Sequence, residues 1–314
     1  MKRVVITGGT GAVGRALLEH LLSRGVEVLL LYRADSARAV DLPDSPLLKR
    51  YPCALEELSS LQLPDAAPCD AFFHLAWAGS YGALREDAAL QQKNVQYAAD
   101  AAALAARLSC RVFVGAGSQA EYGDIPMGTA AHPDMACSPK TAYGAAKLEA
   151  RERSLAVCRL QGVRHVWARL FSVYGEYDRP QTLVMQAIAA FFEGKDGNFT
   201  KGEQIWDYLH AADAAHALCL LSQQGADGGI YNVASGNALP LAEYITQIRD
   251  AVNPQCALHF GTVPYYPGQA MNLRADISDL VRDTDFAPQI SFDEGIRRTL
   301  RWYRASVCQQ GTKR

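Results

Sequence analysis

The sequence has no Cys-x-x-Cys pair, although it contains eight cysteines. These are scattered at positions 53, 69, 110, 137, 158, 219, 256 and 308. Zinc sites are typically marked by such pairs, and the scattered positions indicate no disulfide framework, so we expect neither a metal site nor a disulfide-stabilised fold. Cys158 and Cys219 stand among apolar residues and are typical of small core side chains. A reducing cytoplasm is therefore the simplest compartment for the protein.

Strong charge of one sign and long apolar runs are also absent. Lysine and arginine together number 31 and the acidic residues 33, for a net charge of −2. That balance predicts no nucleic-acid and no membrane-surface partner. No apolar run approaches the roughly 20 residues that span a bilayer, and a strand is predicted so close to Met1 that we expect no signal peptide. With 314 residues, 49% of them hydrophobic, the chain suits one large α/β domain or two fused lobes.

The first fifteen residues carry the most informative local pattern. Val4–Ile6 is predicted to form a short buried strand, and apolar residues at helical spacing predict a helix from Ala12 to Arg24. Between them the glycines fit G-x-G-x-x-G when counted from Gly9, and G-x-x-G-x-x-G when counted from Gly8. Such a turn exposes backbone N–H groups at a helix N-terminus, where a pyrophosphate can bind. The alternative is an ordinary glycine-rich turn without a ligand.

The end of the second predicted strand, Val26–Leu31, bears on the choice of cofactor. In an NAD site an acidic residue is expected there to bind the ribose 2′-hydroxyl, whereas a nearby arginine accepts the 2′-phosphate of NADP. This chain has Arg33 there, with Asp35 two residues later. We therefore expect NADP. The alternative is NAD, with Arg33 solvated and Asp35 binding the ribose.

The remaining pattern predicts an α/β fold in two parts. Strands are expected at 71–77, 111–115 and 163–170, helices at 84–108 and 141–161, and a loop with short elements over 36–68. This alternation indicates a Rossmann-type, doubly wound parallel sheet over residues 1–172. Residues 173–314 are expected to form a smaller C-terminal α/β substrate lobe, although segments of the two can interleave. Its expected helices are 181–193, 212–224, 240–252 and 291–305, and its expected strands are 204–208 and 229–233.

Tyr143 and Lys147 lie four residues apart in a predicted helix, so their side chains share one face. A lysine cation beside a phenol favours the phenolate and lowers the pKa of the tyrosine. Tyr143 would then be a candidate acid/base near neutral pH. Taken alone, such a pair is commonplace on helix surfaces.

Together these motifs resemble the extended short-chain dehydrogenase/reductase family, in its nucleotide-sugar epimerase/dehydratase branch. The stretch 7–14 is similar to the family's cofactor loop, and 143–147 to its Tyr-x-x-x-Lys pair. Residues 118–123 and 169–175 are similar to its Ser-x-x-x-Tyr-Gly and Arg-x-x-Asn-x-Tyr-Gly segments. The segments 202–210, 231–236 and 274–276 resemble its substrate lobe, so the resemblance covers nearly the whole chain.

The resemblance implies a nucleotide-sugar substrate and a role for each matching residue. Tyr143 would be the general acid/base, Lys147 would lower its pKa and bind the nicotinamide ribose, and Ser118 would orient the sugar oxygen. The implied cofactor-binding residues are Gly8, Thr10, Gly11, Ala12, Val13, Gly14, Arg33, Leu75, Ala76, Tyr143, Lys147 and Phe171. The implied substrate-binding residues are Ser118, Gln119, Ser172, Trp206 and Arg274. Asn94 matches a helix asparagine that supports the active site, or is simply exposed on its helix.

Three departures from the family pattern narrow the reaction. The family's 4,6-dehydratases follow their catalytic Thr with an Asp-Glu pair, where this chain has Gln119 and Ala120 after Ser118. Glu121 comes one position too late, and would point to the other face of an extended segment. We therefore do not expect a 4,6-dehydratase. Ser172 replaces the usual asparagine and Trp206 the usual arginine of the diphosphate site. Trp206 would stack on a base or sugar, or pack between the lobes.

Three functions remain as hypotheses. The first is reduction of a 4-keto-6-deoxy nucleotide sugar with NADPH, and the second is a nucleotide-sugar 4-epimerase that retains NAD. The third is a dinucleotide-sensing protein without catalysis. The resemblance also implies a homodimer formed by the helix before Ser118 and the helix of Tyr143. The alanine-rich face at 98–106 would permit that packing, unless it packs on the chain's own sheet.

Overall fold

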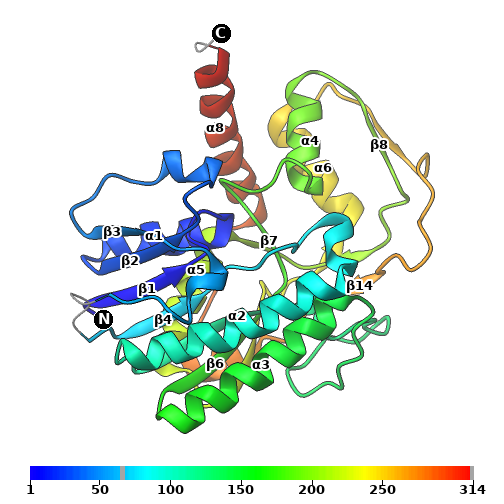
Figure 1. The fold of residues 1–314 in the computed structure, drawn as a ribbon. Coiled ribbons are helices and arrows are strands. Elements are labelled where there is room, and N and C mark those ends of the chain that lie inside the picture. Colours follow the sequence, from blue (N-terminus) through cyan, green and yellow to red (C-terminus); the bar gives the residue numbers. More distant parts are fainter. Residues whose placement is uncertain (64–67, 312–314) are drawn as a thin grey trace.

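The computed structural model describes residues 1–63 and 68–311 (Figure 1). Its centre is a seven-stranded sheet in the order β11-β6-β5-β4-β1-β2-β3, in which every neighbouring pair is parallel. The strands are β1 Arg3–Thr7, β2 Glu27–Tyr32, β3 Leu48–Pro52, β4 Ala71–His74, β5 Val112–Ser118, β6 Arg164–Leu170 and β11 Gly229–Val233. The predicted fold class, a doubly wound parallel α/β sheet, is confirmed.

Helices cover both faces of this sheet. On one face lie α1 (Ala12–Ser23), α5 (Ala211–Gln224) and α7 (Ser278–Thr284). On the other lie α2 (Ala88–Arg107) and α3 (Ala142–Gln161), which pack side by side along their length (Figure 1). Since connections between neighbouring parallel strands are right-handed, helices reach both faces only if the strand order reverses within the sheet.

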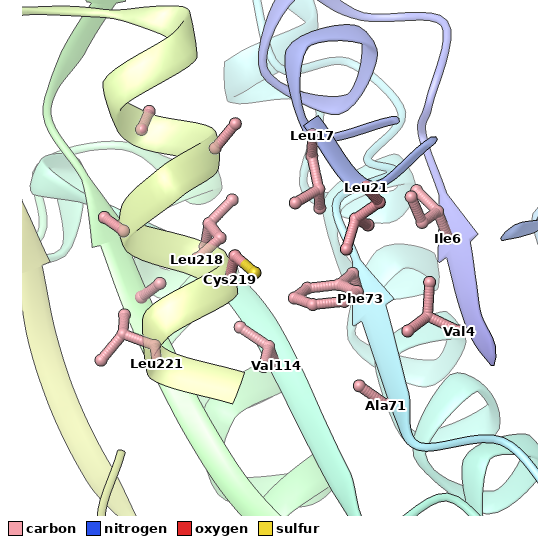
Figure 2. Close-up of a cluster of buried hydrophobic side chains, with 14 of the residues drawn as sticks. Val4, Ile6, Leu17, Leu21, Ala71, Phe73, Val114, Leu218, Cys219 and Leu221 are labelled. Carbon is pink, nitrogen blue, oxygen red and sulfur yellow. The ribbon is translucent and has the colours of Figure 1, made fainter. Parts of the chain in front are cut away.

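Successive side chains of β1 point to opposite faces of the sheet and pack into two different hydrophobic cores. Val4 and Ile6 point to the face of α1 and α5, whereas Val5 points to the face of α2 and α3. Figure 2 shows the first of these cores, where Phe73 of β4 lies between leucines of α1 and of α5. The continuous apolar runs read from the sequence are thus strands buried on both faces.

Several elements differ from the sequence-based expectation, among them most of the short strands after residue 171. β3 lies within the predicted loop at 36–68, because this edge strand buries only Leu48 and so shows no apolar pattern. Residues 64–67 of that loop lie outside the described residues. β11, expected in the smaller lobe, pairs with β6 and extends the central sheet, which is the interleaving that the expected boundaries allowed. The short helix α7 was not predicted.

The remaining elements lie beyond the carboxyl ends of the sheet strands. The helices of this region are α4 Leu183–Phe192, α6 Leu241–Val252 and α8 Phe292–Gly311. The strands of this region are β7 Ser172–Tyr174, β8 Gly197–Phe199, β9 Ile205–Trp206, β10 Tyr208–His210, β12 Leu239–Pro240, β13 Leu258–Phe260 and β14 Asn272–Leu273. β9 lies between β12 and β14, while β7 pairs with β10 and β8 with β13. Buried apolar residues of α4, α6 and α8 form a separate core around Ile188, Phe191 and Ile248.

Two negative findings hold for the described part of the chain. No helix there has the length and apolar character needed to cross a membrane. No cluster of three or more His, Cys, Asp or Glu side chains in those residues could bind a metal ion.

Candidate active site

The cleft forms where the strand order reverses. β1 pairs with β2 on one side and with β4 on the other, and the chain crosses the sheet in opposite directions from there. In such sheets the loops after the two central strands separate and leave a crevice at their carboxyl ends. The glycine turn 8–11 follows β1 directly and the loop from Leu75 follows β4, so both border this crevice.

Two of the glycines in the turn are required by the protein's own packing. Gly8 has a φ of 79°, and a Cβ there would lie 2.6 Å from the backbone nitrogen of Ala76. A Cβ on Gly14 would lie 2.2 Å from the carbonyl oxygen of Gly8. A Cβ on Gly9 would meet closely only a methyl group of Leu30, which can move. The spacing counted from Gly8 is therefore the one that the backbone needs.

Gly11 has a different reason to be glycine. A Cβ there would come no closer than 3.6 Å to the protein, at the carbonyl oxygen of Gly8. The space in front of it belongs to a cleft of about 210 Å³ at the N-terminus of α1. Lining residues are Gly8, Gly11, Ala12, Val13, Gly14, Arg38, Leu75, Leu170, Val173, Tyr177, Asp178 and Arg179. A side chain at position 11 would fill the place where backbone N–H groups can bind a pyrophosphate, so these residues fit a dinucleotide cofactor.

The loop after β4 is tied to the glycine turn. The Thr7 hydroxyl lies 2.9 Å from Nδ1 of His74 and accepts the backbone N–H of Ala76 at 3.4 Å. These bonds place the predicted cofactor residues Leu75 and Ala76 beside Gly8, with Leu75 lining the cleft. Thr10 lies in the same turn but does not line the cleft.

Two other predicted cofactor residues lie away from the cleft. Phe171 packs its ring against Tyr122 in a buried cluster, and its neighbours Leu170 and Val173 line the cleft instead. The Arg33 side chain is 66% exposed and pairs with Asp35 at 3.4 Å. Arg38, in the short 3-10 helix Ala37–Asp41, is the arginine of this region that lines the cleft. Sequence reasoning missed it because residue spacing does not show how this loop folds back.

The predicted catalytic residues do come together. Ser118 ends β5, and Tyr143 and Lys147 share the inner face of α3 behind its N-cap Thr141, whose hydroxyl accepts the Gly144 N–H at 3.0 Å. All three catalytic candidates are buried. Burial raises the pKa of Tyr143, and the Ser118 hydroxyl opposes that shift as a hydrogen-bond partner.

The ammonium of Lys147 lies closer to Trp77 than to Tyr143. This ammonium donates a hydrogen bond to the Ala116 carbonyl oxygen at 2.6 Å and lies 3.6 Å from the ring centre of Trp77. It is 5.8 Å from the ring centre of Tyr143. Burial lowers the pKa of Lys147 to about 7 and raises that of Tyr143, and the lowering of the Tyr143 pKa by Lys147 stays a prediction.

Glu121 is a buried structural carboxylate. The segment after Ser118 is a 3-10 turn rather than extended, so Glu121 turns back beneath Ser118. Its carboxylate accepts the Ser118 backbone N–H at 2.8 Å and the Trp167 indole N–H at 3.0 Å, and pairs with Arg169 at 2.6 Å. The placement on the opposite face applied only to an extended segment, a condition that the 3-10 turn does not meet, and the pairing engages the Glu121 carboxylate with Arg169.

Residues of α2 support the loop after β4. Asn94, fully buried, accepts the Ala78 N–H and donates to the Ala78 carbonyl, each at 2.9 Å. Asn94 therefore supports the loop after β4 and is not exposed on its helix. Gln91 accepts the indole N–H of Trp77 at 2.8 Å, and the Trp77 ring meets Tyr143 edge to face at 5.9 Å. Neither Gln91 nor Trp77 was predicted, although Trp77 follows Ala76 directly.

The predicted substrate residues divide into two groups. Gln119 accepts the Ser118 hydroxyl at 2.8 Å, and Ser172 begins β7 next to the cleft residue Val173. Trp206 is half-buried between two apolar clusters, in agreement with the alternative that it packs between the lobes. The Arg274 carbonyl oxygen accepts the Ala131 N–H at 2.9 Å in the same region. The structure thus places Gln119 beside Ser118 and Ser172 beside the cleft, whereas Trp206 and Arg274 lie at a neighbouring core.

Comparison with known proteins identifies the family. The model of the NAD dependent epimerase/dehydratase family matches residues 4–234, which include the glycine turn, Ser118, Tyr143 and Lys147. The chain belongs to this family. It is thus an enzyme of the extended short-chain dehydrogenase/reductase type, as the motifs predicted. The hypothesis of a non-catalytic sensor is set aside.

Relatives within the epimerase/dehydratase family align with nearly the whole chain. The dTDP-glucose 4,6-dehydratase of Streptomyces niveus is 26% identical over 316 residues, which cover 96% of this chain and 93% of that protein. A UDP-N-acetylglucosamine 4-epimerase from Methanobrevibacter ruminantium, in complex with UDP-N-acetylmuramic acid, superposes with a TM-score of 0.86 at 22% identity, covering 97% and 99%. DesIV, a dTDP-glucose 4,6-dehydratase from Streptomyces venezuelae with NAD and TYD bound, gives 0.82 at 22%, covering 98% of each chain.

Proposed function

We propose that this family member transfers hydride between a nicotinamide cofactor and C4 of a nucleotide-linked sugar, and that its net reaction is reduction of a 4-keto-6-deoxy nucleotide sugar. The observation that carries the proposal is Ser118 beside Tyr143, followed by Gln119 and Ala120. Bound in the cleft above Gly11, the cofactor would supply the hydride. Gly8, Gly11 and the first turn of α1 would hold its pyrophosphate.

The chain's own residues supply binding and proton transfer. The Ser118 hydroxyl would donate a hydrogen bond to the sugar carbonyl oxygen and polarise it. Tyr143 would give its phenolic proton to the same oxygen as the carbon is reduced, which leaves a phenolate on the enzyme. Lys147, already buried beside Trp77, would turn from the Ala116 carbonyl to the cofactor ribose.

Dehydration is disfavoured by the same segment. Elimination of water from a 4-keto sugar needs one group that removes a proton and one that protonates the leaving hydroxyl. The amide of Gln119 and the methyl group of Ala120 do neither. Glu121 is held by Arg169 and is fully buried, so it is not placed to replace them. This argument favours the reductase over the activity of the aligned dTDP-glucose 4,6-dehydratases.

A direct assay tests the reductase. dTDP-4-keto-6-deoxyglucose, prepared from dTDP-glucose with an authentic dehydratase, is mixed with the protein and NADPH or NADH. We expect one cofactor oxidised for each sugar reduced, and Tyr143→Phe should lower the rate by about 10²- to 10⁴-fold. Tyr266→Phe, at a tyrosine that is 63% exposed, should leave it unchanged. No cofactor oxidation with any 4-keto-6-deoxy nucleotide sugar would contradict the proposal.

A 4-epimerase is the second candidate, because two loops beside the cleft are joined. Arg179 donates to the Ser80 hydroxyl at 2.9 Å, and the Tyr81 hydroxyl donates to the Gln181 carbonyl at 3.0 Å. Such links between the loops after β4 and β7 would help to retain a cofactor, which an epimerase needs. Purified protein that carries NAD and interconverts C4 epimers without added cofactor would establish this alternative.

For the cofactor we propose NADPH, with Arg38 rather than Arg33 as the main ligand of its 2′-phosphate. Arg38 lines the cleft, and no ion pair engages it in the described chain. The structurally similar DesIV, by contrast, has NAD bound. Calorimetry with both reduced cofactors should show tighter binding of NADPH, reduced about tenfold or more by Arg38→Gln and less by Arg33→Gln. Equal affinities for NADH and NADPH would overturn this proposal.

A further inference from the structure

Arg85 covers one face of the Tyr143 ring. Its guanidinium carbon lies 4.5 Å from the ring centre, within the range of a cation–π contact. Arg85 belongs to the short 3-10 helix Gly82–Glu86 in the loop after β4 and is half-buried. The described residues include no carboxylate that pairs with it, so its charge is directed at the tyrosine. No motif in the sequence pointed to this residue.

The backbone on both sides of Arg85 is anchored. On one side, the Leu84 carbonyl accepts a hydrogen bond from buried Gln91 at 2.8 Å. On the other side, the Glu86 carboxylate accepts the Ala142 N–H at 3.3 Å, at the first residue of α3. Glu86 thus attaches the loop to the helix that carries Tyr143. The contact of Arg85 with the ring is therefore supported by the neighbouring residues and not by the arginine alone.

The other charged groups around Tyr143 are engaged or more distant. Glu121 pairs with Arg169, and Lys147 is bound to the Ala116 carbonyl. Arg179, on the segment after β7, also acts on Tyr143 by its charge but donates to Ser80. Burial raises the pKa of Tyr143, the Ser118 hydroxyl opposes this most, and Arg85 is the next largest opposing influence.

We propose that Arg85 is a positioning residue whose guanidinium, stacked on the ring of Tyr143, stabilises the phenolate that forms when the tyrosine gives up its proton. A phenolate carries part of its negative charge on the ring, so a cation over the face binds it better than it binds the neutral phenol. Arginine stays charged at every working pH, whereas Lys147 titrates near neutrality. The inference rests on the proposed role of Tyr143 as acid/base.

Direct titration of residue 143 tests the proposal without any substrate. A fluorinated tyrosine, whose phenol is more acidic, is incorporated at position 143 and followed by fluorine NMR against pH. Arg85→Gln should raise the apparent pKa of this phenol by about one unit or more, and Arg85→Lys should restore part of the difference. Arg153→Gln, which removes an exposed arginine of α3 paired with Glu149, should not change it. An Arg85→Gln shift no larger than that of Arg153→Gln would overturn the proposal.

Two further measurements separate the possible failures. Thermal unfolding of each variant establishes that it is folded, and Arg85→Ala replaces Arg85→Gln if the latter is not. In the reductase assay, the limb of the pH–rate profile that depends on Tyr143 should move in the same direction as the NMR titration. A shift in the titration without any reductase activity would refute the proposed function and leave the role of Arg85 standing. Reductase activity without a shift in the titration would refute the role of Arg85 and leave the proposed function standing.

Discussion

Lys147 shows how one buried charge links the stability of this enzyme to pH. Only 4% of the residue is exposed, and burial lowers its pKa from 10.5 to about 7, with the charge of Glu121 opposing. In the unfolded chain the lysine keeps its ordinary pKa. Between these two values the unfolded chain therefore binds more protons than the folded one, and this residue's contribution to stability rises with pH. Below the folded pKa, the cost of burying the cation is fully present.

Lys147→Met should remove that cost. We expect the variant to be more stable than the wild type near pH 6, by about 1–3 kcal/mol, with the difference shrinking as the pH rises toward 10. Urea unfolding of both proteins at several pH values measures it. Lys140→Met, at an exposed lysine paired with Asp124, serves as the control and should show a small effect. A difference between Lys147→Met and wild type that is constant with pH would be evidence against a lowered pKa.

At the scale of elements, α2 determines the shape of the loop after β4. Gln91 is 1% exposed, accepts the Trp77 indole N–H, and donates to the carbonyl oxygens of Gly79 and Leu84. Asn94, one turn later, binds both backbone groups of Ala78. The sequence left Asn94 open between a supporting and an exposed position, and it did not single out Gln91. Only the structure shows that both side chains bind this loop, which carries Trp77 and Arg85.

Gln91→Leu should loosen the loop while leaving the helix intact. One donor and two acceptors would lose their partner, at about 1–3 kcal/mol for each group that stays buried. We expect a lower melting temperature and faster hydrogen exchange over residues 77–86. The exposed neighbour Gln92→Leu is the matched control, because its side chain reaches only Glu149. Equal exchange rates in both variants would show that Gln91 does not hold the loop.

At the scale of the whole molecule, α2 and α3 form a pair on the outside of the sheet (Figure 1). Ala98, Ala101, Ala102 and Ala105 are buried against the chain's own core, so much of the alanine-rich face is already used within one chain. The outward side of α3, around Leu148, is only partly covered. The predicted homodimer therefore stays a prediction that concerns this outer surface.

Light scattering after gel filtration tests the dimer. If two copies pack through α2 and α3, Leu148→Glu should convert a dimer to a monomer, since it would bury a charge at the centre of the interface. Leu160→Glu, at the end of α3 where the leucine is 85% exposed, should leave the dimer intact. A wild-type protein that runs as a monomer at every concentration would refute the prediction.

The sequence by itself determined the fold class and the residues proposed to react. β1, the glycine turn and α1 follow from one another within fifteen residues, and Tyr143 and Lys147 share a face because they are one helical turn apart. These features depend on local spacing, which the chain encodes directly. The family motifs added Ser118, whose place at the end of β5 the structure then showed.

Only the tertiary structure decided the partners of these residues. Glu121 meets Arg169 because β5 and β6 are neighbours in the sheet, and Arg85 reaches Tyr143 because α2 and the first turn of α3 hold its loop. Arg38 lines the cleft at the N-terminus of α1 through the folding of the segment between β2 and β3. Strand order and loop shape bring such distant segments together, and burial then sets the charges of the groups that meet. Neither the order nor the burial can be read from local spacing.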